Sequence, residues 1–271
     1  MSNSAEKLII HEPGVSGQLS PYDLSMKGPE WKAAKFYKDP NTDKVYSLAQ
    51  KIAGANYIID KLWSPSNSAQ LLALLEGRVP VFTPVPSTSG CNVVASAFAK
   101  KLADDLGGEV VEGFQFLDAL HQVPIKFIPT MYKPYTIRDF YVNNEDELSR
   151  LIGDKAVVVV DDVFSTGASA KSFCVALQFS KIQVHTVAGL MGDTRLTPEP
   201  SLIEDLRMVL NNCHLTQFIA QDIAVWLSRG QIGILIKSIK KMRFKVEISL
   251  LAENLQRVLD YRLNGSDAPN S

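Results

Sequence analysis

VVVVDDVFSTGAS, at residues 157–169, is the stretch of sequence that decides the fold. Its four consecutive valines predict a strand of a parallel sheet, because strands buried on both faces carry continuous β-branched runs. Asp161 and Asp162 follow at the carboxyl end of that strand, the edge at which open α/β sheets bind their ligands. The small residues after them predict a tight loop that leads into a helix.

The side chains of this segment suit a phosphorylated sugar. Where a strand ends and the backbone turns, two adjacent carboxylates can reach one ligand, and they suit vicinal hydroxyls or a magnesium ion held by a hydroxylated ligand. Hydroxyls and unobstructed N–H groups at a helix start suit a phosphate. They are supplied by Ser165, Thr166, Gly167 and Ser169. An acid pair beside a phosphate cradle therefore predicts a ribose 5-phosphate site.

A second strand, loop and helix come earlier in the chain. Residues 79–85 predict a strand, and Asn92 is a candidate N-cap for a helix that Gly107 ends. Two such units predict an α/β fold with a parallel sheet and right-handed crossovers. The loop between this strand and helix consists of Ser87, Thr88, Ser89 and Gly90.

The rest of the chain divides around this core. Residues 1–30 are rich in Gly, Pro and Ser and predict an irregular lead-in, followed by the α/β domain over 31–198. Residues 199–263 predict a helical extension, whose first helix begins with a capping box formed by Ser201 and Glu204. We expect its apolar residues to pack on the main domain, or to bind a protein partner or a second copy of the chain. Residues 264–271 form a polar tail, which predicts disorder.

Composition excludes several classes of protein. The formal net charge of −1 gives no overall attraction to nucleic acid or to an anionic membrane. The sequence has no signal peptide and no apolar run near the ~18 residues of a membrane span, so we expect a cytoplasmic protein. The three cysteines and four histidines show no metal-ligand spacing. One dense basic run favours a solvated face over a nucleic-acid surface: Lys237, Lys240, Lys241, Arg243 and Lys245.

The motif at 157–169 resembles the 5-phosphoribosyl 1-diphosphate (PRPP) signature of type I phosphoribosyltransferases, in which a strand is followed by two acids, three variable residues, Thr-Gly and a Ser or Thr. The resemblance implies that Asp161 and Asp162 bind the ribose 2- and 3-hydroxyls and that Ser165 to Ser169, Ala168 included, hold the 5-phosphate. It also implies an Mg²⁺ ion carried by PRPP. Family members that act on 6-oxopurines usually have an acid where this chain has Ser165, which argues against such an acceptor.

Two further segments match positions of this family. The loop of Ser87, Thr88, Ser89 and Gly90 takes the place of the pyrophosphate loop, and its setting resembles the competence (DNA-uptake) phosphoribosyltransferase-like group. Those relatives have basic residues in this loop, whereas this chain has none. Residues 120–141 take the place of the flexible catalytic loop, which closes over the ligand. Its basic residues are candidates for contact with pyrophosphate: Lys126, Lys133 and Arg138.

The sequence thus predicts a phosphoribosyltransferase that moves ribose 5-phosphate from PRPP to a small-molecule or base acceptor through a nitrogen atom and releases pyrophosphate. Two alternatives stay open. The chain could be a regulatory protein that binds PRPP or a nucleotide without turnover, as the uncharged loop suggests. It could also be an effector enzyme of a defence or toxin system built on the same fold.

Overall fold

The computed structural model describes residues 18–19, 47–87, 92–119, 140–192, 196–242 and 245–264. A five-stranded sheet with the order β1-β7-β6-β2-β3 forms the centre, and each neighbouring pair is parallel. A separate antiparallel pair is formed by β4 and β5. The strands are β1 (Gln18–Leu19), β2 (Pro80–Pro84), β3 (Glu109–Val110), β4 (Leu117–Ala119), β5 (Phe140–Val142), β6 (Ala156–Val163) and β7 (Val184–Met191).

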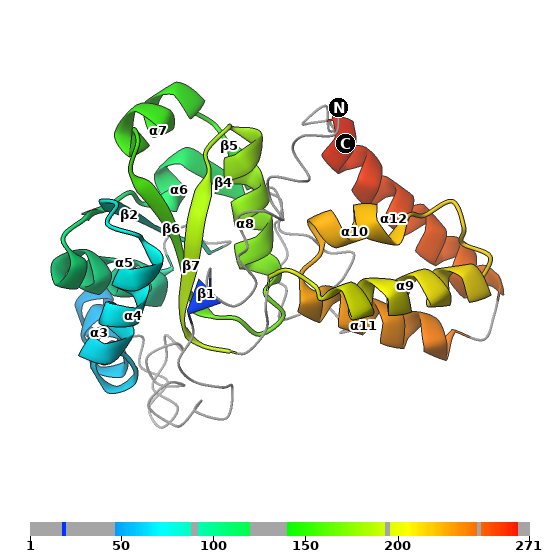
Figure 1. The fold of residues 1–271 in the computed structure, drawn as a ribbon, viewed down its shortest axis with the longest axis horizontal. Coiled ribbons are helices and arrows are strands. Elements are labelled where there is room, and N and C mark those ends of the chain that lie inside the picture. Colours follow the sequence, from blue (N-terminus) through cyan, green and yellow to red (C-terminus); the bar gives the residue numbers. More distant parts are fainter. Residues whose placement is uncertain are drawn as a thin grey trace.

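The helices cover both faces of the sheet and continue beyond it (Figure 1). They are α3 (Leu48–Leu62), α4 (Pro65–Leu74), α5 (Val93–Leu106), α6 (Gly113–Phe116), α7 (Glu145–Ile152), α8 (Ala168–Phe179), α9 (Pro200–Asn212), α10 (Ala220–Trp226), α11 (Arg229–Lys241) and α12 (Lys245–Asn264). The α/β architecture with a parallel sheet is therefore confirmed.

The valine run forms the buried middle of the sheet, as predicted. Val157 and Val159 belong to the core on the side of α7 and α8, whereas Val158 and Val160 belong to the core on the side of α3, α4 and α5. This alternation is the period of two that a pleated strand imposes. All four valines are buried, so this part of β6 is covered on both faces. This burial explains why no polar residue interrupts the run.

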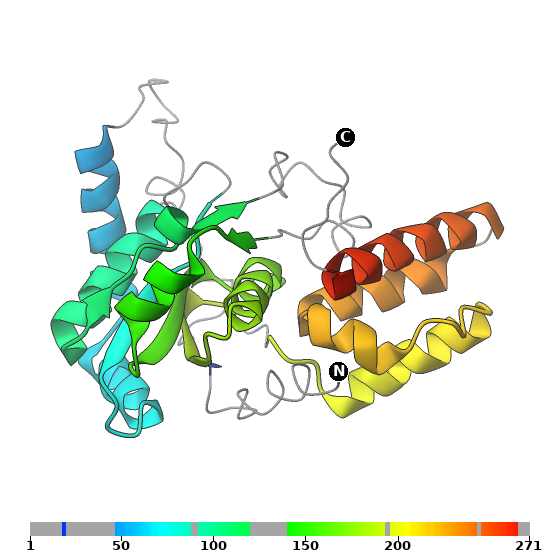
Figure 2. The same cartoon turned by 90° about the horizontal axis from the view of Figure 1, so that it is seen from above.

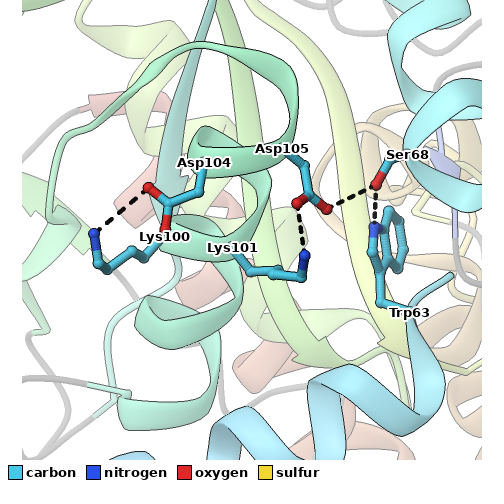
Figure 3. A network of polar contacts seen from close by, with 6 residues as sticks. All are labelled: Trp63, Ser68, Lys100, Lys101, Asp104 and Asp105. Atoms are coloured by element: carbon cyan, nitrogen blue, oxygen red, sulfur yellow. Dashed lines mark hydrogen bonds and ion pairs between the residues drawn. The ribbon is translucent and has the colours of Figure 1, made fainter. Parts of the chain in front are cut away.

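The outer helices are fixed by a polar network between α4, α5 and the residue after α3 (Figure 3). Trp63 Nε1 donates to Ser68 Oγ at 2.9 Å, and Ser68 Oγ donates to Asp105 Oδ2 at 3.1 Å. Asp105 also pairs with Lys101 at 2.6 Å. The Trp63 ring packs edge-on against Phe98, so the network and the apolar core meet at one side chain.

Helices α9 to α12, which we call the helical unit, share a hydrophobic core of their own and lie on one side of the sheet domain (Figure 2). Phe218, Ile223 and Ile236 are buried in this core, so the expectation that they pack on the main domain is wrong. Ile219 is exposed. Trp226 stacks on Phe179 of α8 with ring centroids 5.4 Å apart, which joins the two parts.

Several predicted boundaries differ from the structure. Gln18–Leu19 pairs with β7 as an edge strand, so the lead-in is not wholly irregular. The Ser201 capping box is wrong: Glu199 occupies the N-cap position with Pro200 after it, and Glu204 pairs with Arg207 instead. Proline at the first helical position has the required φ, and the helix starts two residues earlier than predicted. Residues 265–271 of the expected tail lie outside the described residues.

Candidate functional site

The acid pair lies in the last part of β6 and is nearly buried. Asp161 is 6% exposed and Asp162 is 4% exposed. The strand continues through Val163, so the two side chains leave from opposite faces, and the turn that we expected directly at the pair comes after it. Asp161 Oδ1 accepts a hydrogen bond from Asp162 N–H at 2.8 Å. A ligand can therefore contact both carboxylates only if the residues that bury them at the carboxyl edge of the sheet move away.

Phe164 anchors the loop that follows the acids. Its N–H donates to Met191 O at 2.9 Å and extends the β6–β7 ladder past the motif, and its ring is fully buried. A Cβ on Gly189 would lie 2.6 Å from Phe164 Cε2, and a Cβ on Gly192 would lie 2.4 Å from Phe164 O. Gly192 also has a φ of +111°, which L side chains rarely adopt. Only glycines at these two positions leave room for the Phe164 anchor.

The loop presents free backbone donors at the start of α8. Gly167 is the N-cap residue, with φ +73°, and gives the helix no side-chain cap. By contrast, α4, α5 and α7 begin with side-chain caps from Ser64, Asn92 and Asn144. Among the described residues, no hydrogen-bond acceptor is present for the N–H groups of Gly167 and Ser169. Uncapped N–H groups and the positive end of the helix dipole make this start suited to an anion.

The hydroxyls of the loop are arranged beside these donors. Thr166 Oγ1 accepts a hydrogen bond from Ala168 N–H at 3.4 Å, which tightens the turn and leaves the hydroxyl proton available as a donor. Ser165 is exposed, while Thr166 and Ser169 are half-buried. The structure thus brings together the five residues predicted to hold a phosphate, directly after the acid pair.

The first residue of the predicted pyrophosphate loop lies at the same edge. Pro84 of β2 aligns with Val160 of β6, and Val85 N–H donates to Val160 O at 2.8 Å, so the chain toward Ser87 runs beside the strand that carries the acids. Ser87 is half-buried. The other members of that loop, Thr88, Ser89 and Gly90, lie outside the described residues.

A third acid, Glu112, stands at this edge and was missed by the sequence analysis. It follows β3, and its Oε2 accepts a hydrogen bond from Ser96 Oγ of α5 at 2.9 Å. Burial raises the pKa of the Glu112 carboxyl above its ordinary value of 4.5, and the Ser96 hydrogen bond lowers it by less. Perturbed carboxyls at the carboxyl ends of strands are candidates for functional roles. Because β3 ends at Val110, Glu112 lies in the connection between β3 and α6.

The predicted catalytic loop begins and ends at an antiparallel ladder. Leu117 aligns with Val142, and Ala119 aligns with Phe140. Phe140 packs edge-on against Phe173 of α8, with ring centroids 5.3 Å apart, so the base of the loop contacts the helix that begins at the phosphate cradle. Residues 120–139 lie outside the described residues, and with them Lys126, Lys133 and Arg138.

The sequence analysis also missed the residues that pack on the loop from the helical unit and from the segment before it. A Cβ on Gly167 would lie 2.9 Å from Leu196 Cδ2 and 3.3 Å from Ser228 Cβ. Ser228 caps α11 through a capping box with Gln231, and this Ser-x-x-Gln pattern was the available signal. Lys237, Lys240 and Lys241 of the dense basic run lie in α11, and Lys245 begins α12, whereas Arg243 lies outside the described residues.

Neither a metal cluster nor a membrane helix is found in the described part of the chain. No group of three or more His, Cys, Asp or Glu side chains there is placed to hold a metal ion. None of its helices combines the length and apolar character that a bilayer crossing requires. No protein-family model, curated protein or solved structure matches this chain.

Proposed function

We propose that the chain binds PRPP at the carboxyl edge of its sheet and transfers ribose 5-phosphate to a nitrogen acceptor. The observation that carries the proposal is the order of groups along β6 and α8: two carboxylates, a buried aromatic anchor, and then a helix start without a side-chain cap. The parallel sheet, in which the end of β2 lies beside β6, is compatible with a type I phosphoribosyltransferase fold. The sequence motif supports that assignment.

In this proposal the chain supplies binding and orientation. The N–H groups of Gly167 and Ser169 and the Thr166 hydroxyl hold the 5-phosphate, and Asp161 and Asp162 accept hydrogen bonds from the ribose hydroxyls. The acceptor nitrogen forms a bond to C1 and loses its proton as the bond from C1 to pyrophosphate breaks; Mg²⁺ would be carried by the phosphates of PRPP. Fixing the sugar in this way contributes to the rate by orientation. Ser165 is the fifth residue counted from Asp161, where family members that act on 6-oxopurines usually have an acid. Its presence argues against a 6-oxopurine acceptor.

Calorimetry with Mg-PRPP tests the proposal. We expect binding by the wild type and a roughly tenfold or greater weakening in Asp161→Asn and in Asp162→Asn, measured separately because the two side chains point to opposite faces. Asp154→Asn is the matched control, because Asp154 is an exposed aspartate at the opposite edge of the sheet. Absence of binding by the wild type, or equal affinity in all four proteins, would contradict the proposal.

A second assay separates transfer from binding alone. Pyrophosphate release is measured across adenine, orotate, uracil and other nitrogen bases, with hypoxanthine and guanine as the bases expected to fail. The lack of basic residues in the loop of Ser87, Thr88, Ser89 and Gly90 favours the alternative of a regulatory PRPP-binding protein. Tight binding with no release for any acceptor would support that alternative instead.

A further inference from the structure

We propose that Ser228, in the helical unit, is a positioning residue for the phosphate loop. The Ser228 hydroxyl donates a hydrogen bond to Thr166 O, across 62 positions of sequence. Ser228 has no exposed surface and Thr166 is half-buried, so the bond is shielded from water on the Ser228 side. The inference rests on the proposed function, because it gives the phosphate cradle of that site a second anchor.

The peptide bond between Thr166 and Gly167 explains how the anchor acts. In a trans peptide the C=O and N–H groups point in opposite directions. When Ser228 holds the Thr166 carbonyl toward the helical unit, the Gly167 N–H is turned away from that unit. This N–H is one of the donors for which the described residues provide no acceptor. Ser228 therefore fixes the direction of a group proposed to bind the 5-phosphate.

The same side of the loop is closed by packing. Leu196 and Ser228 both lie where a side chain on Gly167 would have to be. Arg229 Nε donates to both carboxylate oxygens of Glu199, at 2.9 and 3.0 Å, and so joins the chain after Leu196 to the start of α11. These contacts form one clamp on the loop, which we call the loop clamp: Leu196, Glu199, Ser228 and Arg229.

The helical unit also contacts the far end of α8. Phe179, the last residue of that helix, stacks on Trp226, two residues before Ser228. The unit thus touches α8 near both ends, and a shift of α11 relative to α8 must either break the Ser228 bond or move the loop. This gives a bound partner of the helical unit a route to the phosphate site.

The test compares three variants. Ser228→Ala removes the hydroxyl. Gln231→Ala weakens the same capping box but leaves the bond to Thr166, because Gln231 Oε1 accepts from Ser228 N–H. Ser47→Ala removes the serine of an equivalent Ser-Gln capping box at α3, which packs on α5 and not on the loop. A purely structural role of Ser228 predicts the same loss of ligand affinity in Ser228→Ala and Gln231→Ala.

Two readouts are taken on the full chain. Calorimetry with ribose 5-phosphate is expected to give about three- to tenfold weaker binding in Ser228→Ala, in line with one hydrogen bond, and less than twofold change in the two controls. Deuterium uptake without ligand is expected to rise in peptides covering 164–170 in Ser228→Ala alone.

The outcomes separate this inference from the proposed function. Wild-type affinity in Ser228→Ala, or equal uptake at 164–170 in Ser228→Ala and Gln231→Ala, overturns the role of Ser228. If the wild type binds no ribose 5-phosphate while uptake at 164–170 rises in Ser228→Ala alone, the proposed function fails and Ser228 remains the anchor of this loop.

Discussion

The two edges of the central sheet differ in the charged groups that they carry. At the amino edge, Arg78, Lys155 and Lys181 line an open pocket of about 250 Å³ together with Asp154 and His185. At the carboxyl edge stand Asp161, Asp162 and Glu112. Helices α5 and α8 begin beyond the ends of β2 and β6, at the second edge, whereas α7 and α8 end before the starts of β6 and β7, at the first edge.

The cations of the amino edge have a structural explanation. Helices α7 and α8 end there, and exposed carbonyls at a helix C-terminus attract positive charge. Lys155 Nζ donates to Leu151 O of α7 at 3.3 Å and pairs with Glu109 at 2.8 Å. A basic pocket at this edge therefore requires no ligand.

The carboxyl edge differs because its helix donors are left open. At α5 the Asn92 side chain accepts from Ala95 N–H, whereas α8 begins at Gly167 without a side-chain cap. Asp161 and Asp162 lie in β6, shortly before the uncapped start of α8. Uncapped N–H donors beside acids therefore indicate a ligand site more strongly than charge alone.

The largest effect is expected from removing the aromatic anchor of the loop. Phe164→Ala leaves a cavity between β6 and β7 and should lower the free energy of unfolding by about 3–5 kcal/mol in urea titration. Ile182→Ala, which truncates a buried side chain lining the amino-edge pocket, is the control. Both variants lose stability, but only Phe164→Ala should weaken PRPP binding by the folded protein. An equal loss of affinity in both would remove the distinction between the edges.

Next in size is Gly167→Ala, with Gly107→Ala as its control. Both glycines have a φ near +70°, so each alanine costs roughly 1–2 kcal/mol in backbone strain. A Cβ at Gly107 meets nothing within 4 Å, whereas at Gly167 it meets Leu196 and Ser228. Calorimetry should show ribose 5-phosphate binding reduced at least ~10-fold in Gly167→Ala only. Undiminished binding by Gly167→Ala would show that the loop clamp does not shape the cradle.

A smaller effect is expected at the amino edge itself. Lys181 is exposed, so Lys181→Ala should change the free energy of unfolding by less than ~0.5 kcal/mol. Its affinity for Mg-PRPP and for inorganic phosphate should equal that of the wild type in calorimetry. A loss of phosphate affinity in this variant would show that the anion binds at the amino edge, which would contradict the proposed difference between the two edges.

The smallest effect concerns pH. Burial raises the pKa of Glu112, so the folded protein holds this proton more tightly than the unfolded chain does. That contribution to stability is present below pH 4.5 and is lost as the pH rises through the raised pKa. Glu112→Gln stays neutral at every pH and should therefore gain stability over the wild type as the pH rises. Thermal unfolding at pH 4 and pH 7 checks this, with a gain of about 1–2 °C expected only at pH 7.

The sequence was sufficient for the features that depend on local pattern. Four valines in a row predicted the buried strand, Asn92 and Gly107 predicted the ends of α5, and the acids were placed at the carboxyl edge. These residues carry their information in type and spacing. The helical unit was recognised as helical, although its own core was not predicted.

Contacts between distant segments could not be predicted from the sequence. Nothing at Ser228 indicates that its hydroxyl meets Thr166, because the two are joined only by the packing of α11 against the start of α8. The burial of Asp161 and Asp162 depends on how far β6 continues, and its continuation through Val163 puts their side chains on opposite faces. Such features follow from tertiary packing, which local patterns do not contain.

One measurement compares the two edges directly: amide chemical shifts of the ¹⁵N-labelled protein during titration with ribose 5-phosphate. The account predicts saturable shifts at Gly167, Ser169 and Ala170, at the open start of α8, and unchanged resonances at Gly153, Lys155 and Lys181. Shifts confined to the amino edge, or no shifts at any concentration, would contradict the claim that the carboxyl edge holds a phosphorylated sugar.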